Sequence, residues 1–169
     1  MTVRNDASSR FSKANRWGLF PSAAFAWNVA QENFLKNSKA ISGLKLRIGW
    51  GRTGQQDIGS DYYPYLARYL SSSALEMRYF MGDGYYTTLA PLAYNSNLKW
   101  ETTETYNVGL DFGFAKDRIT GSAEAYYRYT YDLLNVISTP LGSNFGNSII
   151  SNIGNMENKG LEFKLNFIT

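Results

Sequence analysis

The sequence predicts an all-β fold made of antiparallel strands, and three observations support this prediction. Apolar and polar residues alternate with a period of two in several segments, as they do when successive side chains point to opposite faces of a strand. Aromatic residues make up 16% of the chain, although its mean hydropathy of -0.34 is slightly polar. No stretch approaches the roughly 20 apolar residues that a membrane-spanning helix needs, which excludes an α-helical membrane protein.

Six segments are predicted strands. The four with the clearest alternation are residues 22–29 (SAAFAWNV), 43–50 (GLKLRIGW), 105–114 (TYNVGLDFGF) and 160–167 (GLEFKLNF). Residues 118–131 form a fifth strand, whose polar face carries charges of both signs on Arg118, Glu124 and Arg128. The sixth, residues 148–153 (SIISNI), alternates least cleanly because two isoleucines are adjacent.

The connections between these strands differ in length in a regular way. In chain order they are residues 30–42 with a possible helical turn at 31–36, the long segment 53–97, the tight turn 115–117, the intermediate segment 132–147 and the short segment 156–159. Outer-membrane barrels place short turns on the periplasmic side and long loops outside. On this pattern, strands beginning near 43, 118 and 160 run outward, and those beginning near 22, 101 and 148 run inward.

Alternation alone does not distinguish antiparallel transmembrane β-barrel strands from a soluble β-sandwich. Two features favour the barrel. Several segments exceed the usual soluble strand of about five or six residues, and Trp or Tyr lies near several strand ends, where barrels have aromatic girdles. A soluble β-sandwich carbohydrate-binding module remains the alternative. So does a complete barrel of about eight strands, if the long segment holds two more strands near 61–70 and 75–81.

Composition excludes most familiar enzyme chemistry. The chain has no cysteine and no histidine, which removes disulfides, thiol nucleophiles, imidazole bases and Cys/His zinc sites. The net charge is +3, but the 17 Lys and Arg are scattered among 14 acidic residues without a basic cluster. We therefore expect no catalytic residue, no metal site, no cofactor and no nucleic-acid partner. Residues 1–6 lack the apolar segment of a signal peptide.

Two motifs could indicate other chemistry. Residues 49–54 match the glycine pattern of a dinucleotide-binding turn, but no amphipathic helix follows them, so loop glycines at a strand end are favoured. Five carboxylates could supply an acid–base pair for glycoside hydrolysis, although solvated loop charges explain them better. They are Asp57, Asp61, Asp83, Glu101 and Glu104.

The long segment is rich in tyrosine, and exposed tyrosines can stack on sugar rings or pack against a partner. Anchoring at a membrane interface and packing within the loop are the alternative roles. The candidates for substrate contact are Tyr62, Tyr63, Tyr65, Tyr85 and Tyr86. A second group, on the polar faces of the strands, is expected to form pairs across neighbouring strands and to hydrate a barrel interior. It comprises Lys45, Arg47, Glu124, Arg128, Glu162 and Lys164.

Several motifs resemble the SusC/RagA-type TonB-dependent outer-membrane transporters, in the order in which that family has them. They are residues 6–11 (DASSRF, with Ala7 where the family usually has Gly), 15–22 (NRWGLFPS) with Trp27, 44–47 with 51–59, 95–103 (NSNLKWETT, with Ser96 in place of the usual Pro), 107–113 and 152–162. Together these motifs span nearly the whole chain.

The resemblance implies that residues 1–169 are a segment of a barrel domain of about 22 strands, without the family's signal peptide and plug domain. It further implies a bacterial outer-membrane location, import of oligosaccharides or peptides, and no enzymatic activity. The implied partners are outer-membrane lipid, a SusD-like lipoprotein facing the extracellular loops, and TonB, which acts through parts of the family that this sequence lacks.

Overall fold

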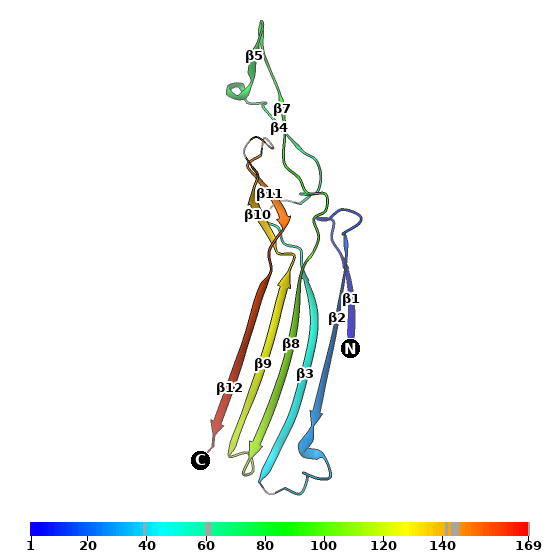
Figure 1. Ribbon diagram of the computed structural model, residues 1–169, viewed down its shortest axis with the longest axis vertical. Helices are drawn as coiled ribbons and strands as arrows, with labels where there is room; N and C mark the ends of the chain where they lie inside the picture. The colour runs from blue at the N-terminus through cyan, green and yellow to red at the C-terminus, as the bar shows by residue number, and fades with distance from the viewer. Residues whose placement is uncertain (39, 60–61, 141, 143–145, 169) are drawn as a thin grey trace.

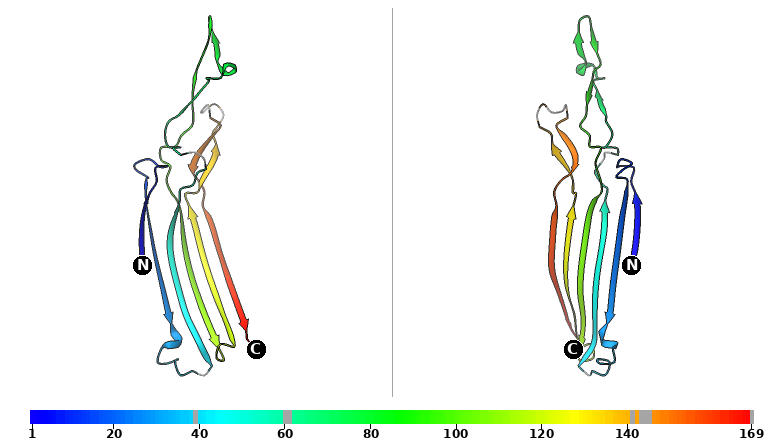
Figure 2. Two further views of the ribbon diagram at one scale, coloured as in Figure 1. Left: turned by 180° about the vertical axis from the view of Figure 1, so that it is seen from behind. Right: turned by 45° about the vertical axis from the view of Figure 1, so that its right-hand side comes forward.

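One antiparallel sheet forms the body of the protein. The computed structural model describes residues 1–38, 40–59, 62–140, 142 and 146–168. The sheet contains, in spatial order, β1 (Thr2–Ala7), β2 (Trp17–Asn28), β3 (Ile41–Gln55), β8 (Glu101–Phe114), β9 (Ile119–Tyr131) and β12 (Met156–Phe167). Figures 1 and 2 show that it is a single curved layer without a second sheet over it. The all-β prediction is confirmed, and the β-sandwich is not favoured.

The remaining elements are short. β10 (Leu134–Ser138) pairs with β11 (Ser148–Asn152), β4 (Tyr69–Ser71) with β7 (Leu89–Pro91), and β5 (Tyr79–Met81) with β6 (Gly84–Tyr86). These ribbons all project from one end of the sheet, here called the loop end, and β5 lies farthest out (Figure 1). The opposite end, the turn end, carries the 3₁₀ turn η1 (Val29–Gln31), whereas η2 (Leu75–Met77) lies in the long loop. No helix among the described residues is long and apolar enough to cross a membrane.

The strand register places the predicted apolar sides on one face of the sheet. Leu46 lies opposite Trp27 on one neighbour and Leu110 on the other. Leu110 in turn faces Ala123, which faces Phe163. Because side chains alternate along each strand, the positions between these residues form a second, polar face. The apolar face is exposed rather than packed, as the 70% exposure of Phe163 demonstrates.

Five of the six predicted strands are strands of this sheet, and most extend further than the alternation indicated. β2 begins five residues before residue 22, and β3 continues five residues past residue 50. β1 was missed, because its polar sequence TVRND carries little apolar signal. It pairs with the first half of β2, from Thr2 opposite Ser22 to Ala7 opposite Trp17.

Three predictions near the C-terminus were wrong. Residues 148–152 form β11, but this strand pairs with β10 outside the main sheet. Residues 156–159 are not a connection, since they begin β12 and pair with β9 from Met156 opposite Thr130. The last strand therefore runs from the loop end to the turn end, inward rather than outward on the predicted scheme. When residues 148–153 are counted as a strand of the main sheet, the direction expected for β12 is reversed.

The complete small barrel is also contradicted. Within the described residues, the strands found in the long loop pair with each other and join no edge of the main sheet. The sheet stays open, with β1 and β12 as its edges. An open six-stranded sheet cannot close on itself as an eight-stranded barrel would.

The predicted connections at the turn end are confirmed in part. The tight turn at residues 115–117 keeps all three residues left-handed, with φ of 52°, 59° and 64°. This backbone is uncommon outside glycine, and hydrogen bonds support it: the Ser42 hydroxyl donates to Asp117 Oδ1 (2.6 Å) and accepts from the Asp117 N–H (3.0 Å). In the connection after β2, the Lys36 N–H donates to the Glu32 carbonyl (2.8 Å), as the predicted helical turn requires.

Gly121 allows an aromatic contact across β9. A Cβ at this position would overlap the Phe112 ring and the Lys164 carbonyl oxygen. The Phe112 ring instead reaches across the glycine to stack on Phe163, with 6.2 Å between centroids. A side chain at residue 121 would displace this ring from the apolar face.

We expect Gly121→Ala to lower the free energy of unfolding by about 1–3 kcal/mol, because the added methyl overpacks this contact. Gly49→Ala is the matched control: it also lies within a strand, and its added Cβ would meet only Asn107 at 3.9 Å. Urea unfolding in detergent micelles of the protein that carries this chain measures both variants. Equal midpoints for the two would contradict the assignment.

Candidate functional site

The polar face of the sheet carries an ion cluster across three strands. The Arg47 guanidinium on β3 donates to both Asp111 carboxylate oxygens on β8, through Nε and Nη2 at 2.9 Å each. Its Nη2 also pairs with Glu124 on β9. Gly109 lies between them, and a Cβ there would come within 3.0 Å of Arg47 Nη2. A glycine at this position therefore lets one arginine form ion pairs with carboxylates on two neighbouring strands.

The predicted pairing of polar-face charges holds for only part of the set. Arg47 and Glu124 pair as expected. Lys45, Arg128, Glu162 and Lys164 form no ion pair within the part of the chain that the structure describes. Glu162 lies opposite Glu124, so two negatively charged side chains face each other across neighbouring strands. The alternation of side chains along each strand assigned these residues to the correct face. Which of them form ion pairs depended on how neighbouring strands align.

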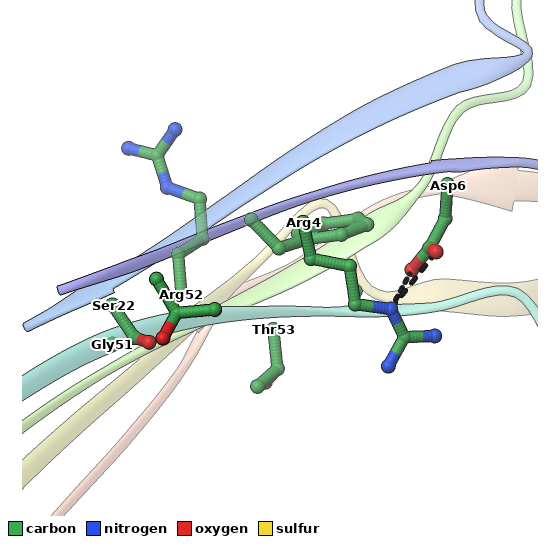
Figure 3. A pocket seen from close by; sticks show the side chains of 9 residues that line it. Arg4, Asp6, Ser22, Gly51, Arg52 and Thr53 are labelled. Atoms are coloured by element: carbon green, nitrogen blue, oxygen red, sulfur yellow. Dashed lines mark hydrogen bonds and ion pairs between the residues drawn. The ribbon is translucent and has the colours of Figure 1, made fainter.

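A shallow pocket of about 270 Å³ opens where β2 separates from β3. Their pairing ends at Ser22 opposite Gly51, after which the outer part of β2 pairs with β1. Figure 3 shows Arg4 and Asp6 at this pocket, joined by an ion pair of 2.7 Å. Charged, hydroxyl and glycine residues line the pocket together with the Phe20 ring, so it presents both polar and apolar surface.

A small core at the loop end holds the first loop against the long loop. It contains Phe11, Phe20, Leu98 and Trp100, and we call it the loop-base cluster. The Trp100 ring centroid lies 5.3 Å from those of both Phe11 and Phe20. Its Nε1 donates to the Arg16 carbonyl at 3.1 Å. Phe11 and Leu98 are fully buried, in contrast to the exposed face below.

Two asparagines tie the loop bases together. Asn152 Nδ2 donates to the carbonyls of Lys99 (2.8 Å) and Asp132 (2.9 Å), and its Oδ1 accepts from the Lys99 N–H (2.9 Å). Asn15 Nδ2 donates to the carbonyls of Asn97 (3.1 Å) and Leu98 (3.2 Å). Three of the recognised motifs, at 15–22, 95–103 and 152–162, thus meet at one place. The sequence analysis assigned no role to either asparagine, because a single asparagine in a sequence does not indicate which distant residue it binds.

The structure separates the five candidate tyrosines into two groups. Tyr62, Tyr63 and Tyr65 follow β3 near the base of the long loop, where the Arg10 guanidinium lies 5.5 Å from the Tyr62 ring centroid. Tyr85 and Tyr86 lie on β6 near the tip (Figure 1). There Tyr85 packs 5.2 Å from Phe80, between centroids. All except the half-buried Tyr65 are exposed, but the five do not form one site.

The described carboxylates among the acid–base candidates accept hydrogen bonds or form ion pairs within the structure. Asp57 accepts from Arg10, and Asp83 from the Tyr86 hydroxyl. Glu101 accepts from the Leu134 N–H, and Glu104 pairs with Arg52 at 2.6 Å. Asp61 lies outside the described residues. No group of three or more Asp or Glu that could hold a metal ion occurs among the described residues.

The glycine motif at residues 49–54 lies wholly within β3. A dinucleotide-binding motif would instead form a turn between a strand and a helix. Gly54 has a different use here, since a Cβ on it would overlap the Phe20 ring of the loop-base cluster.

We expect Asn152→Ala to loosen the loop end. The substitution leaves two carbonyls and one N–H without their partner, which costs about 1–3 kcal/mol of local stability. Trypsin cleavage after Arg68 or Arg78 should accelerate by roughly tenfold or more, because opening exposes the long loop. Asn155→Ala is the control, since Asn155 is exposed and belongs to the same segment. Cleavage rates that match between the two variants would contradict the role of Asn152.

Comparisons with known proteins agree with this geometry. Residues 1–168 match the family described as TonB dependent receptor-like, beta-barrel. The TonB-dependent receptor SusC of Bacteroides thetaiotaomicron is 53% identical over 98% of the chain. The TonB-dependent receptor P3 of Formosa agariphila is 42% identical over 98% of it. A chain of the solved RagAB peptide importer in its closed-closed state covers 96% of this chain, with a TM-score of 0.79 and 31% identity.

The matched region is a minor part of each relative. It covers 16% of both curated receptors and 17% of the RagAB chain, so this chain spans about a sixth of their length. Within that region the match is nearly continuous, at an identity well above the level at which only a fold is shared. The resemblance to SusC/RagA-type proteins is thereby confirmed, and the chain belongs to the TonB dependent receptor-like β-barrel family.

Proposed function

We propose that this chain forms part of the wall of a TonB-dependent importer in a bacterial outer membrane. The observation that carries the proposal is the exposed apolar face of a single-layered sheet, with a polar, ion-paired face behind it. In such a wall the apolar face contacts lipid and the polar face lines the interior. The chain contributes structure and contacts to transport, and catalyses no covalent change.

The substrate class we propose is oligosaccharides or peptides. One solved structure supports the peptide part of this choice, since RagAB is a peptide importer. The oligosaccharide part rests on the resemblance of the sequence to SusC/RagA-type transporters. The Arg47–Asp111–Glu124 cluster and the pocket beside Arg4 would present charges and hydroxyl groups to a hydrated interior. Both substrate classes carry polar groups along their whole length, so a polar wall suits their passage.

The loops would supply the external contacts. We propose that Tyr62, Tyr63 and Tyr65 contact substrate at the entrance, and that Tyr85 and Tyr86 contact it at the tip of the long loop. All of these rings except that of the half-buried Tyr65 are exposed, which favours stacking on sugars or on peptide side chains. A SusD-like lipoprotein would face the same loops, and TonB would act through other segments of the full protein.

Deletion of the gene that encodes this chain should abolish growth of its host on one class of oligosaccharide or peptide supplied as the sole carbon source. Growth on monosaccharides and amino acids, which need no such importer, is the control, and the restored gene should return the lost growth. Unchanged growth across a broad panel of both classes would contradict the importer function.

If the tyrosine rings stack on substrate, Tyr62→Ala and Tyr85→Ala should each raise the half-saturating substrate concentration for uptake by about 3–10-fold, equivalent to about 0.5–1.5 kcal/mol per ring contact. Tyr→Phe at either position retains the ring and should leave uptake near normal. Arg10→Ala separates loss of the Tyr62 ring from loss of its cation contact. Normal uptake in both alanine variants would exclude these two rings.

A further inference from the structure

The pocket beside Arg4 lies on the polar face of the sheet. Arg4 on β1 is paired with Phe20 on β2, and residues directly opposite each other project to the same face. Because side chains alternate along β2, Phe20 shares its face with Ala26, which lies opposite Arg47. The pocket therefore opens to the same side of the sheet as the ion cluster around Arg47, which is the interior side of the proposed wall.

The Phe20 ring supplies the apolar part of this pocket. It lies over Gly18 and Gly54, where a Cβ on either residue would overlap it. Trp100 packs against the ring edge-on, with 5.3 Å between centroids and 70° between the planes. Phe20 is only 8% exposed as a result, so it offers a small apolar patch that the surrounding residues hold in place.

The Arg4–Asp6 ion pair places donors and acceptors side by side at this patch. Arg4 Nε donates to Asp6 Oδ1 at 2.8 Å, and Figure 3 shows the two side chains directed toward each other. Within the described ranges, the two terminal nitrogens of Arg4 form no hydrogen bond. The Arg4 side chain is 74% exposed and that of Asp6 28%. Both groups therefore retain hydrogen-bonding capacity toward a ligand.

Three hydroxyl groups complete the lining. They belong to Thr2, Ser22 and Thr53, and each can donate one hydrogen bond and accept others. Figure 3 shows Ser22 and Thr53 at the same opening as Arg4. The pocket thus combines an uncharged balance of one cation and one anion with hydroxyls and a small aromatic surface.

A sugar ring has the chemistry that matches this lining. Its neighbouring hydroxyls both donate and accept, so they can bind Arg4 and Asp6 together, while its apolar C–H groups contact Phe20. A charged end of a peptide would be attracted by one member of the ion pair and repelled by the other. The pocket volume of about 270 Å³ lies near the lower limit of ligand pockets, which suits one ring rather than a longer segment.

We infer that this pocket binds one sugar unit of an oligosaccharide near the loop end of the wall. Arg4 and Asp6 would bind neighbouring hydroxyls, Ser22 and Thr53 further ones, and Phe20 the apolar side of the ring. The inference rests on the proposed importer function and deepens it, because it selects oligosaccharides over peptides. It also adds a site in the sheet that is separate from the tyrosines of the long loop.

Titration calorimetry of the purified full-length protein in detergent micelles tests this site. The probe is the oligosaccharide on which the deletion strain loses growth, chosen from gluco-, manno-, xylo-, galacto- and fructo-oligosaccharides. Arg4→Gln and Asp6→Asn each remove one charged hydrogen-bonding group and should raise Kd by about tenfold or more. Thr53→Val removes one hydroxyl with little change of shape and should raise Kd by about 3–5-fold.

Glu157→Gln is the matched control. Glu157 and Lys159 form an ion pair two residues apart on β12, at 3.0 Å, as Arg4 and Asp6 do on β1. Glu157 lies on the apolar face with Leu161, so its substitution should leave Kd unchanged. Exposed ion pairs contribute little to stability, and the unfolding midpoints of all variants should stay within about 2 °C of the parent. If the Arg4 and Asp6 variants unfold earlier, Thr53→Val decides.

The outcomes separate the sugar site from the importer function. Weaker binding in the pocket variants, with unchanged binding in Glu157→Gln, supports the site. Equal affinity in all variants would overturn the site and leave the importer function intact. Loss of growth on peptides alone would overturn the choice of oligosaccharides, again without affecting the importer. Growth that is unchanged on both classes contradicts the importer function, and this inference with it.

Discussion

The antiparallel register between β3 and β8 is the constraint on which the rest of the structure depends. It pairs the strands from Ile41 opposite Phe114 to Gln55 opposite Glu101. A slip of one residue would move every side chain to the other face. Arg47 would then lose its approach to Asp111 over Gly109, and charged side chains would enter the apolar face. One register thus fixes both the ion cluster and the apolar surface.

The sheet has no internal core to hold it together. The buried apolar side chains of the described chain, Phe11, Phe20 and Leu98, are gathered near the loop end, while the apolar face of the strands is open. Backbone pairing satisfies the interior strands, and the two edges require neighbours. Such a sheet packs little against itself, so the proposed barrel and membrane would supply the contacts that it lacks.

The loop end is organised differently from the wall. There Trp100, Asn15 and Asn152 join segments that are more than fifty residues apart in sequence, through one aromatic cluster and a few side-chain hydrogen bonds to backbone carbonyls. These contacts fix the bases of three loops while the tip at β5 and β6 extends away from them (Figure 2). A rigid base with an extended tip allows the exposed tyrosines to be presented at two separate heights.

The sequence by itself determined five of the six strands of the main sheet and their faces, because period-two alternation is a local property that each segment carries alone. It also determined the family, through motifs at 15–22, 95–103 and 152–162. Only the tertiary structure decided that β11 lies outside the sheet, that β12 runs inward, and that Arg47 pairs with Asp111 and Glu124. These facts depend on which strands become neighbours and in what register, and such long-range pairing leaves no mark on the local pattern of any one segment.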